Sequence, residues 1–312
     1  MGWPCRPELW GDTLEQARAD YAAVANAVAA FEPVTMIANP GADAAGARAA
    51  CGSGVEIVEL GLDDSWLRDC GPIYRLGDDG TREAVHFGFN AWGEKFPPWD
   101  RDAAVGGLIA RELGDPVVTS SLVLEGGSIL TDGTGTLLTT EQCLLNENRN
   151  PTWSREQIED ELKARLGVQR IVWLGMGLLE DRDTDGHVDM IAAFVAPGEV
   201  LLQVAAPDNP NHSHCVENRS RLKAAGLSVR ELEPLPYVEV AGEPVVASYL
   251  NFYICNRGVI VPVTGADTDE QALATIADCY PGREVVSVPG RVIAFGGGGP
   301  HCITQQVPAS DG

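Results

Sequence analysis

A glycine followed by a short β-branched run, Gly54-Val55-Glu56-Ile57-Val58, is the first of five such stretches along the chain. The others are Gly114 before Val117-Val118, Gly167 before Ile171-Val172, Gly226 before Ser228-Val229, and Gly282 before Val285-Val286. The five glycines are 60, 53, 59 and 56 residues apart. A near-constant spacing of this size is typical of one supersecondary unit used repeatedly. We therefore predict an α/β fold of about five units, each with two or three strands and one helix, in a single domain.

Helical patterns precede these runs. Apolar residues recur with a period of 3.6 at residues 9–31, 42–51, 100–113, 154–166, 215–225 and 269–280. Two of the helices are expected to begin with capping boxes, Ser154 with Gln157 and Thr268 with Gln271. Gly167 stands where a left-handed helix cap is expected.

Composition restricts the class of protein. The 312 residues are 45% hydrophobic and 21% charged, which is typical of a globular protein, and no apolar run reaches the roughly 20 residues that span a bilayer. The net charge of -23 repels nucleic acid and anionic membranes and attracts cations. The eight cysteines are scattered without a C-x-x-C pair, as expected for reduced thiols. These features predict a cytoplasmic protein with no nucleic acid or membrane partner.

A candidate nucleophile follows a run of glycines near the C-terminus. Four successive glycines, Gly296–Gly299, free the backbone to lie against a ligand, and Cys302 comes three residues later. An apolar strand is expected from Ile303. If the chain is extended here, the side chains of His301 and Cys302 point to opposite faces, so His301 is not expected to act as the base.

Acidic residues and one histidine form a second group of candidates. Alternation places Asp185, His187 and Asp189 on one side of an expected strand, and Glu125 and Asp69 stand near the ends of two others. These residues and Cys302 follow the repeated runs at similar distances, so they converge if the units surround an axis. Several acids around one thiol and one imidazole indicate a site for a cation.

Other kinds of site are less well supported by the sequence. His212-Ser213-His214-Cys215 has zinc-ligand side chains, but no second pair lies at finger-like spacing. The sequence has no nucleophile elbow, P-loop or dinucleotide-binding fingerprint. We therefore expect no metal and no cofactor. A non-enzymatic binding module is the alternative, but it would not need a thiol, an imidazole and three acids together.

Eight motifs in order resemble the agmatine deiminases and extend over nearly the whole chain. They are Trp3-Pro4, Asp64–Pro72, Phe89–Gly93, Leu124–Ser128, Asn148–Pro151, Thr184–Asp189, Ala247–Tyr253 and His301–Gln306. The resemblance implies the guanidine-modifying (pentein) fold, a five-bladed α/β propeller with pseudo-fivefold symmetry, as one domain over residues 1–312.

The resemblance also implies roles for individual residues. Cys302 would be the nucleophile, and His187 and Glu125 the acid/base pair. Asp69 and Asp189 would hold the guanidinium group.

Around these residues, the resemblance implies that Trp66 is a wall beside the substrate, that Asp183 helps to bind it, and that Gly297–Gly299 form the loop before the nucleophile. Asp183 and Met190 stand where Glu and Asn are usual in this family, and Gly299-Pro300 where Asn-Ile is usual. The region 205–247 is expected to be shorter than in typical members.

The expected reaction is hydrolysis of agmatine to N-carbamoylputrescine and ammonia through a covalent thiouronium on Cys302. A guanidinium is a planar cation with several N–H donors, which suits bidentate binding by carboxylates. The alternatives are deimination of free arginine, peptidylarginine or a secondary metabolite, and transfer of the amidino group to an amine. The partner is then a small cationic guanidino compound, and a homo-oligomer is compatible with the sequence.

Overall fold

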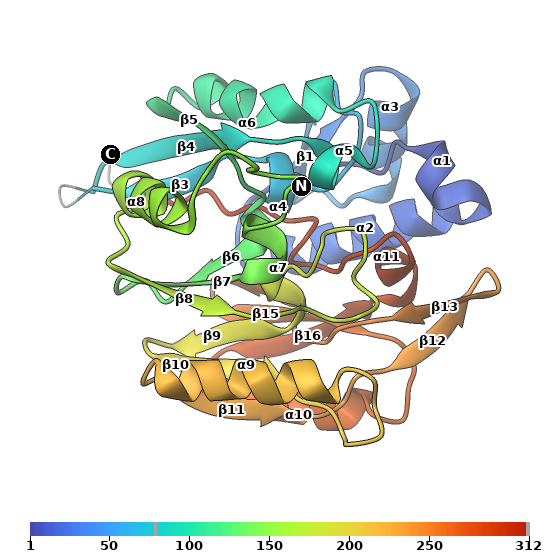
Figure 1. Ribbon diagram of the computed structural model, residues 1–312. Coiled ribbons are helices and arrows are strands. Elements are labelled where there is room, and N and C mark those ends of the chain that lie inside the picture. The colour runs from blue at the N-terminus through green and yellow to red at the C-terminus, as the bar shows by residue number, and fades with distance from the viewer. Residues whose placement is uncertain (78–79, 310–312) are drawn as a thin grey trace.

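The computed structural model describes residues 1–77 and 80–309 and shows an α/β fold built from small mixed sheets (Figure 1). All five predicted β-branched runs are strands: β2 (Val55–Glu59), β5 (Val117–Val123), β8 (Arg170–Leu174), β11 (Ser228–Leu232) and β16 (Glu284–Pro289). Each pairs in parallel with a preceding strand: β1 (Val34–Ala38), β4 (Arg82–Gly88), β7 (Thr136–Thr140), β10 (Glu199–Gln203) and β15 (Gly258–Val263). The repeat predicted from the glycine spacing is therefore present in the strand order.

In four of these sheets, a third strand pairs antiparallel with the first strand of the parallel pair. These strands are β3 (Ile73–Leu76), β6 (Ile129–Thr131), β9 (Ala192–Ala196) and β14 (Tyr253–Cys255). In the first sheet, Gly2 takes this place through a single parallel bridge to Ile37. A separate hairpin of β12 (Tyr237–Val240) and β13 (Glu243–Val246) projects at one side of the molecule (Figure 1).

The helices that link the parallel strands are close to the predicted ranges. They are α3 (Ala42–Ala50), α6 (Asp100–Glu112), α8 (Arg155–Leu166), α9 (His212–Ala224) and α10 (Asp269–Cys279). Parallel strands need such crossovers, because a tight turn cannot return the chain to the same end of a sheet. Figure 1 shows α6 along one edge of the molecule and α9 along the opposite edge, with strands between them.

One of the two predicted capping boxes is confirmed. Ser154 and Gln157 exchange hydrogen bonds at the start of α8, and Gly167 ends that helix at φ 71°. The box predicted at Thr268 is wrong, because its hydroxyl forms a hydrogen bond with the hydroxyl of Tyr249 instead.

The single helix predicted over residues 9–31 is interrupted. The chain forms α1 (Pro7–Trp10), a 3-10 turn (Gly11–Thr13) and α2 (Leu14–Ala29). Gly11 has φ 49°, which lies outside the helical region and breaks the axis. The break is accompanied by stacking of buried Trp10 on Trp66, with ring centroids 5.9 Å apart.

Short helical turns carry the segments that form the site described below. They are α4 (Leu67–Cys70), α5 (Ala91–Glu94), η2 (Gly126–Ser128), α7 (Glu141–Leu144), η3 (Val188–Met190) and α11 (Arg291–Phe295). All eight cysteines are free thiols. Within the described ranges, every helix is too short or too polar to cross a bilayer.

Candidate active site

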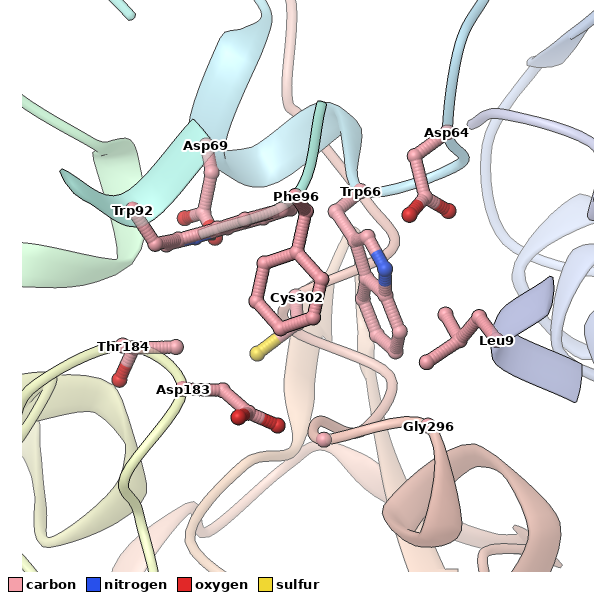
Figure 2. A pocket seen from close by; sticks show the side chains of 11 residues that line it. Leu9, Asp64, Trp66, Asp69, Trp92, Phe96, Asp183, Thr184, Gly296 and Cys302 are labelled. Atoms are coloured by element: carbon pink, nitrogen blue, oxygen red, sulfur yellow. The ribbon is translucent and has the colours of Figure 1, made fainter. Parts of the chain in front are cut away.

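A narrow pocket of about 30 Å³ contains the predicted nucleophile (Figure 2). The sulfur of Cys302 points into it, with the carboxylates of Asp69 and Asp183 on different sides and the ring of Trp66 as a wall. Gly297 also lines the pocket. Gly296, from the glycine run noted in the sequence, lines it as well. The remaining lining residues were not singled out as site residues from the sequence: Leu9, Asp64, Trp92, Phe96 and Thr184.

The segment that carries His187 and Asp189 is a turn, and the predicted strand is absent. Asp185 and Gly186 have φ values of 62° and 83°, and η3 begins directly after His187. The side chains at 185, 187 and 189 therefore do not share a strand face. The side chains of His187 and Asp189 reach the centre of the site, whereas Oδ2 of Asp185 forms an ion pair with Nζ of Lys95 at 2.8 Å.

The backbone around the nucleophile also differs from the prediction. Residues 300–303 form turns, so neither the extended chain at His301 nor the strand at Ile303 is present. His301 and Cys302 both contact the same carboxylate oxygen, Oδ2 of Asp189. The His301 Nδ1 atom lies 2.7 Å from it and the Cys302 sulfur 3.5 Å from it. The Cys302 backbone N–H donates to Oδ1 of Asn251 at 3.2 Å, which fixes the main chain at the predicted nucleophile.

The glycines before the nucleophile are needed for close packing. Gly297 has φ 105°, a backbone conformation that is strained for any residue with a side chain. A Cβ atom at Gly298 would lie 2.7 Å from the Trp66 ring and 2.8 Å from Cβ of Cys302. At Gly299 it would lie 2.7 Å from Asn251 Oδ1. Gly298 and Gly299 therefore bring the backbone of the loop close to Trp66, Cys302 and Asn251.

The side chains of His187, Asp69 and Asp189 converge beside the Cα atom of Gly127. A Cβ atom there would lie 2.7 Å from His187 Nδ1, 2.8 Å from Asp69 Oδ1 and 2.9 Å from Asp189 Oδ2. The Gly127 backbone N–H donates to Asp69 Oδ1, and the Trp92 indole N–H donates to Asp69 Oδ2, both at 2.9 Å. These two bonds orient the Asp69 carboxylate, and the missing side chain at Gly127 leaves space between the acids and the imidazole.

His187 is held as a cation by its neighbours. Burial disfavours the charged ring, but Asp69, Cys143 and Glu125 outweigh it and raise the pKa of His187 well above its usual value. Nδ1 lies 3.8 Å from Asp69 Oδ1, and Nε2 lies 3.8 Å from Glu125 Oε2. Both ring nitrogens are buried without a hydrogen-bond partner in the described parts of the chain. They are therefore available to a substrate or water.

The two carboxyl groups beside His187 differ in charge state. Burial favours the neutral form of both, but Arg149 outweighs burial at Glu125 and lowers its pKa to about 2. At Asp69 burial dominates and raises the pKa to about 6, although His187 partly offsets it. Glu125 therefore stays ionised, while Asp69 changes its charge within the physiological range.

The surroundings of Cys302 favour its neutral thiol. Burial, followed by the charges of Asp189 and Asp69, raises the pKa of Cys302 well above its usual value. Burial also opposes ionisation of Asp189, but the hydrogen bond from His301 outweighs it and lowers that pKa. A cation that binds between the acids would reverse this effect on the thiol.

Among the residues that were missed as functional in the sequence, four support the groups of the site directly: Arg149, Trp92, Asn251 and Cys143. Arg149, Trp92 and Asn251 stand inside the motifs quoted above, which was the available signal. Cys143 had no such signal; its sulfur lies 3.9 Å from Glu125 Oε2.

A metal site has limited support in this arrangement. In the described residues, only Glu125, Cys143 and His187 bring three potential metal ligands within 4.8 Å of one another. Arg149 already places a cation 2.6 Å from Glu125, which competes with a metal ion. His212, from the alternative zinc motif, instead contacts the carbonyl oxygen of Ala205 through Nδ1 at 2.7 Å.

Comparisons with known proteins identify relatives over the whole chain. The family described as Porphyromonas-type peptidyl-arginine deiminase matches residues 1–308. The agmatine deiminase of Stutzerimonas stutzeri (strain A1501) is 44% identical over 340 aligned residues, which cover 99% of this chain and 92% of that protein.

Solved structures agree with these matches. The Enterococcus faecalis agmatine deiminase superposes with a TM-score of 0.93 at 34% identity, covering 99% of this chain and 92% of the other. A C. jejuni agmatine deiminase with substrate bound gives 0.88 at 30% identity, covering 95% and 88%. Sequence, fold and full-length coverage together place this chain in the agmatine deiminase family, among the Porphyromonas-type peptidyl-arginine deiminases.

Proposed function

We propose that this protein hydrolyses agmatine to N-carbamoylputrescine and ammonia, with Cys302 as the nucleophile. The convergence of the Cys302 thiol, the His187 imidazole and the carboxylates of Asp69 and Asp189 above Gly127 carries this proposal. It is supported by family membership, since similar proteins are named agmatine deiminases. A planar guanidinium fits between two carboxylates that are already oriented.

Binding of the substrate cation activates the nucleophile in this proposal. The guanidinium enters between Asp69 and Asp189 and offsets the negative charge that keeps the Cys302 thiol neutral. The thiol then releases its proton to solvent, and the sulfur lies beside the guanidinium carbon. At the other end, the exposed Asp183 carboxylate receives the ammonium group of agmatine, and Trp66 borders the alkyl chain.

The chemistry then proceeds in two halves. The thiolate forms a bond to the guanidinium carbon, His187 donates its proton to the departing nitrogen, and ammonia leaves an S-alkylthiouronium. The neutral imidazole next takes a proton from water, whose oxygen adds to the same carbon. The C–S bond breaks and the proton of the added hydroxyl passes to the Cys302 sulfur, which restores the thiol and releases the neutral ureido product. In total, one water is consumed, and one ammonia and one proton are formed.

We propose a narrower role for Glu125 than the resemblance implies. A carboxylate with a pKa of about 2 does not carry a proton at neutral pH. We assign the proton transfers to His187 alone and give Glu125 the task of stabilising the imidazolium. Arg149 acts through Glu125 and is a positioning residue.

The arrangement of the five sheets supports a five-bladed α/β propeller. Each sheet has the same parallel strand pair joined by a helix, and the chain passes through them in order. We infer one pseudo-fivefold domain over residues 1–312 with about five repeats, and with the site on its axis. Cytoplasmic location and a homo-oligomeric state stay predictions from the sequence.

Ammonia release from a substrate series tests the proposal. We expect kcat/KM for agmatine to exceed that for free arginine by about 100-fold or more, because the α-carboxylate of arginine meets the like charge of Asp183 where the ammonium of agmatine is paired. Peptidylarginine should react more weakly still. Asp183→Asn should reduce the preference for agmatine, with Asp208→Asn, at an exposed position, as the matched control. A ratio near one, or dependence of ammonia release on an added amine acceptor, would contradict the proposal.

A further inference from the structure

A second cavity lies behind the reactive centre. It has a volume of about 190 Å³, compared with about 30 Å³ for the pocket in Figure 2. We call it the far cavity, and the pocket with Cys302 the near pocket. The residues of the far cavity that matter here are Arg68, Thr131, Asp189, Tyr253, His301 and Gln306.

Neighbouring residues in the chain divide between the two spaces. Asp69 and Cys302 line the near pocket, whereas Arg68 and His301 line the far cavity. Asp189 lines the far cavity, and its Oδ2 atom contacts the Cys302 sulfur at 3.5 Å. The Asp189 side chain therefore connects the wall of the far cavity with the Cys302 sulfur.

Two buried polar atoms beside the far cavity have no protein partner. Nη2 of Arg68 and Oδ1 of Asp189 make no hydrogen bond to any described residue, although the residues are only 5% and 2% exposed. A buried polar atom without a hydrogen-bond partner destabilises the fold. One atom is a donor on a cation and the other an acceptor on an anion. The wall of the far cavity therefore carries both a cation and an anion, which favours a small neutral molecule that donates and accepts hydrogen bonds, because Asp189 repels an anion and Arg68 repels a cation.

We propose that the far cavity is a port through which water reaches the thiouronium and ammonia leaves. This proposal rests on the proposed function and adds the route by which water enters and ammonia leaves. Substrate in the near pocket fills that narrow space and blocks water there. The C–N bond breaks before water adds, so neutral ammonia must leave and water must enter while the substrate's carbon skeleton is still bound to Cys302. Both molecules are small, neutral and able to donate and accept hydrogen bonds, which suits a wall that carries the charges of Arg68 and Asp189.

Substitutions at the mouth of the far cavity test the port. Thr131 and Gln306 line the cavity and are exposed, so Thr131→Trp and Gln306→Trp narrow the opening from two different segments. Thr119→Trp, on an exposed position of β5, is the matched control. We expect kcat with agmatine to fall at least about 10-fold in both mouth variants, because exchange of ammonia for water becomes limiting.

Two further readouts separate a blocked port from a damaged site. Intact-mass measurement after acid quench should show a larger fraction of enzyme carrying the Cys302 adduct than in the control. Alkylation of Cys302 by iodoacetamide without substrate should stay within twofold of the control, since the near pocket remains open. The port would be overturned if kcat of both mouth variants stays within twofold of the control, or if kcat falls without an increase in the adduct. Either result leaves the proposed function standing. If the unsubstituted protein releases no ammonia from agmatine, the proposed function fails and the port with it.

Discussion

Nε of Arg149 lies 2.6 Å from Oε1 of Glu125, and neither side chain is exposed to solvent. Arg149 Nη1 also lies 2.8 Å from Asp185 Oδ2, so one buried guanidinium links the carboxylate beside His187 to the turn that carries it. Removing one member of a buried ion pair leaves an uncompensated charge. Arg149 therefore controls the charge state around His187 without reaching the near pocket.

Arg149→Met should change the pH profile as well as the rate. Without Arg149, burial raises the pKa of Glu125 from about 2, and His187 loses part of the negative charge that keeps it protonated. We expect kcat to fall at least about 10-fold and the alkaline limb of the pH–activity profile to shift to lower pH. Arg155→Met, at a partly exposed ion pair, is the control. Arg149→Lys should partly restore the profile, and an unchanged profile in both variants would refute this role.

Cys302→Ala should abolish turnover of agmatine and leave the fold intact. Loss of a covalent nucleophile costs several orders of magnitude in rate. Cys51→Ala, at a half-buried thiol away from the pocket, should keep full activity. EDTA should not change the rate of the unsubstituted protein. Substantial activity in Cys302→Ala, or loss of activity with the chelator, would count against a metal-independent thiol mechanism.

Asp69→Asn and Asp189→Asn should each lower kcat/KM by at least about 100-fold, or roughly 2.7 kcal/mol of transition-state stabilisation. Both remove a charge that faces the guanidinium, and Asp208→Asn is the control. The unsubstituted protein should lose kcat/KM as pH falls through about 6, because Asp69 becomes protonated there. Values within threefold of the parent in both variants would show that the substrate is placed wrongly.

Asp102→Asn should stabilise the protein at neutral and alkaline pH. Burial, together with the charge of Asp64, raises the pKa of Asp102 to about 8, although its oxygen accepts the Asp63 N–H at 2.9 Å. A carboxyl with a raised folded-state pKa contributes stability at low pH that is lost as pH rises from about 4 to about 8. Asn keeps an acceptor and stays neutral.

We expect the variant to be at least about 1 kcal/mol more stable at pH 8, with a smaller difference at pH 4. Thermal unfolding of both proteins across this range measures it, and Asp208→Asn again serves as the control. A constant difference between pH 4 and pH 8 would show that Asp102 does not titrate as proposed.

The regular part of the fold was readable from sequence because it depends on local chemistry. β-Branched runs after glycines, such as Val55–Glu59, form strands, and the cap at Ser154 and Gln157 begins a helix. These features involve residues close in the chain. The failed predictions concern backbone conformations that distant contacts impose, such as the turn at Asp185, whose carboxylate is held by Lys95 and Arg149.

For the site, the sequence by itself determined which residue types are present and which motifs carry them: a thiol after glycines, one histidine and several acids. Only the tertiary structure decided their charge states and their division between two spaces. The pKa values of Glu125 and Asp69 move in opposite directions because one buried carboxylate meets Arg149 and the other does not. Likewise, Cys302 and His301 are neighbours in sequence but line different cavities. Burial and long-range pairing, which no short motif encodes, are the physical reason.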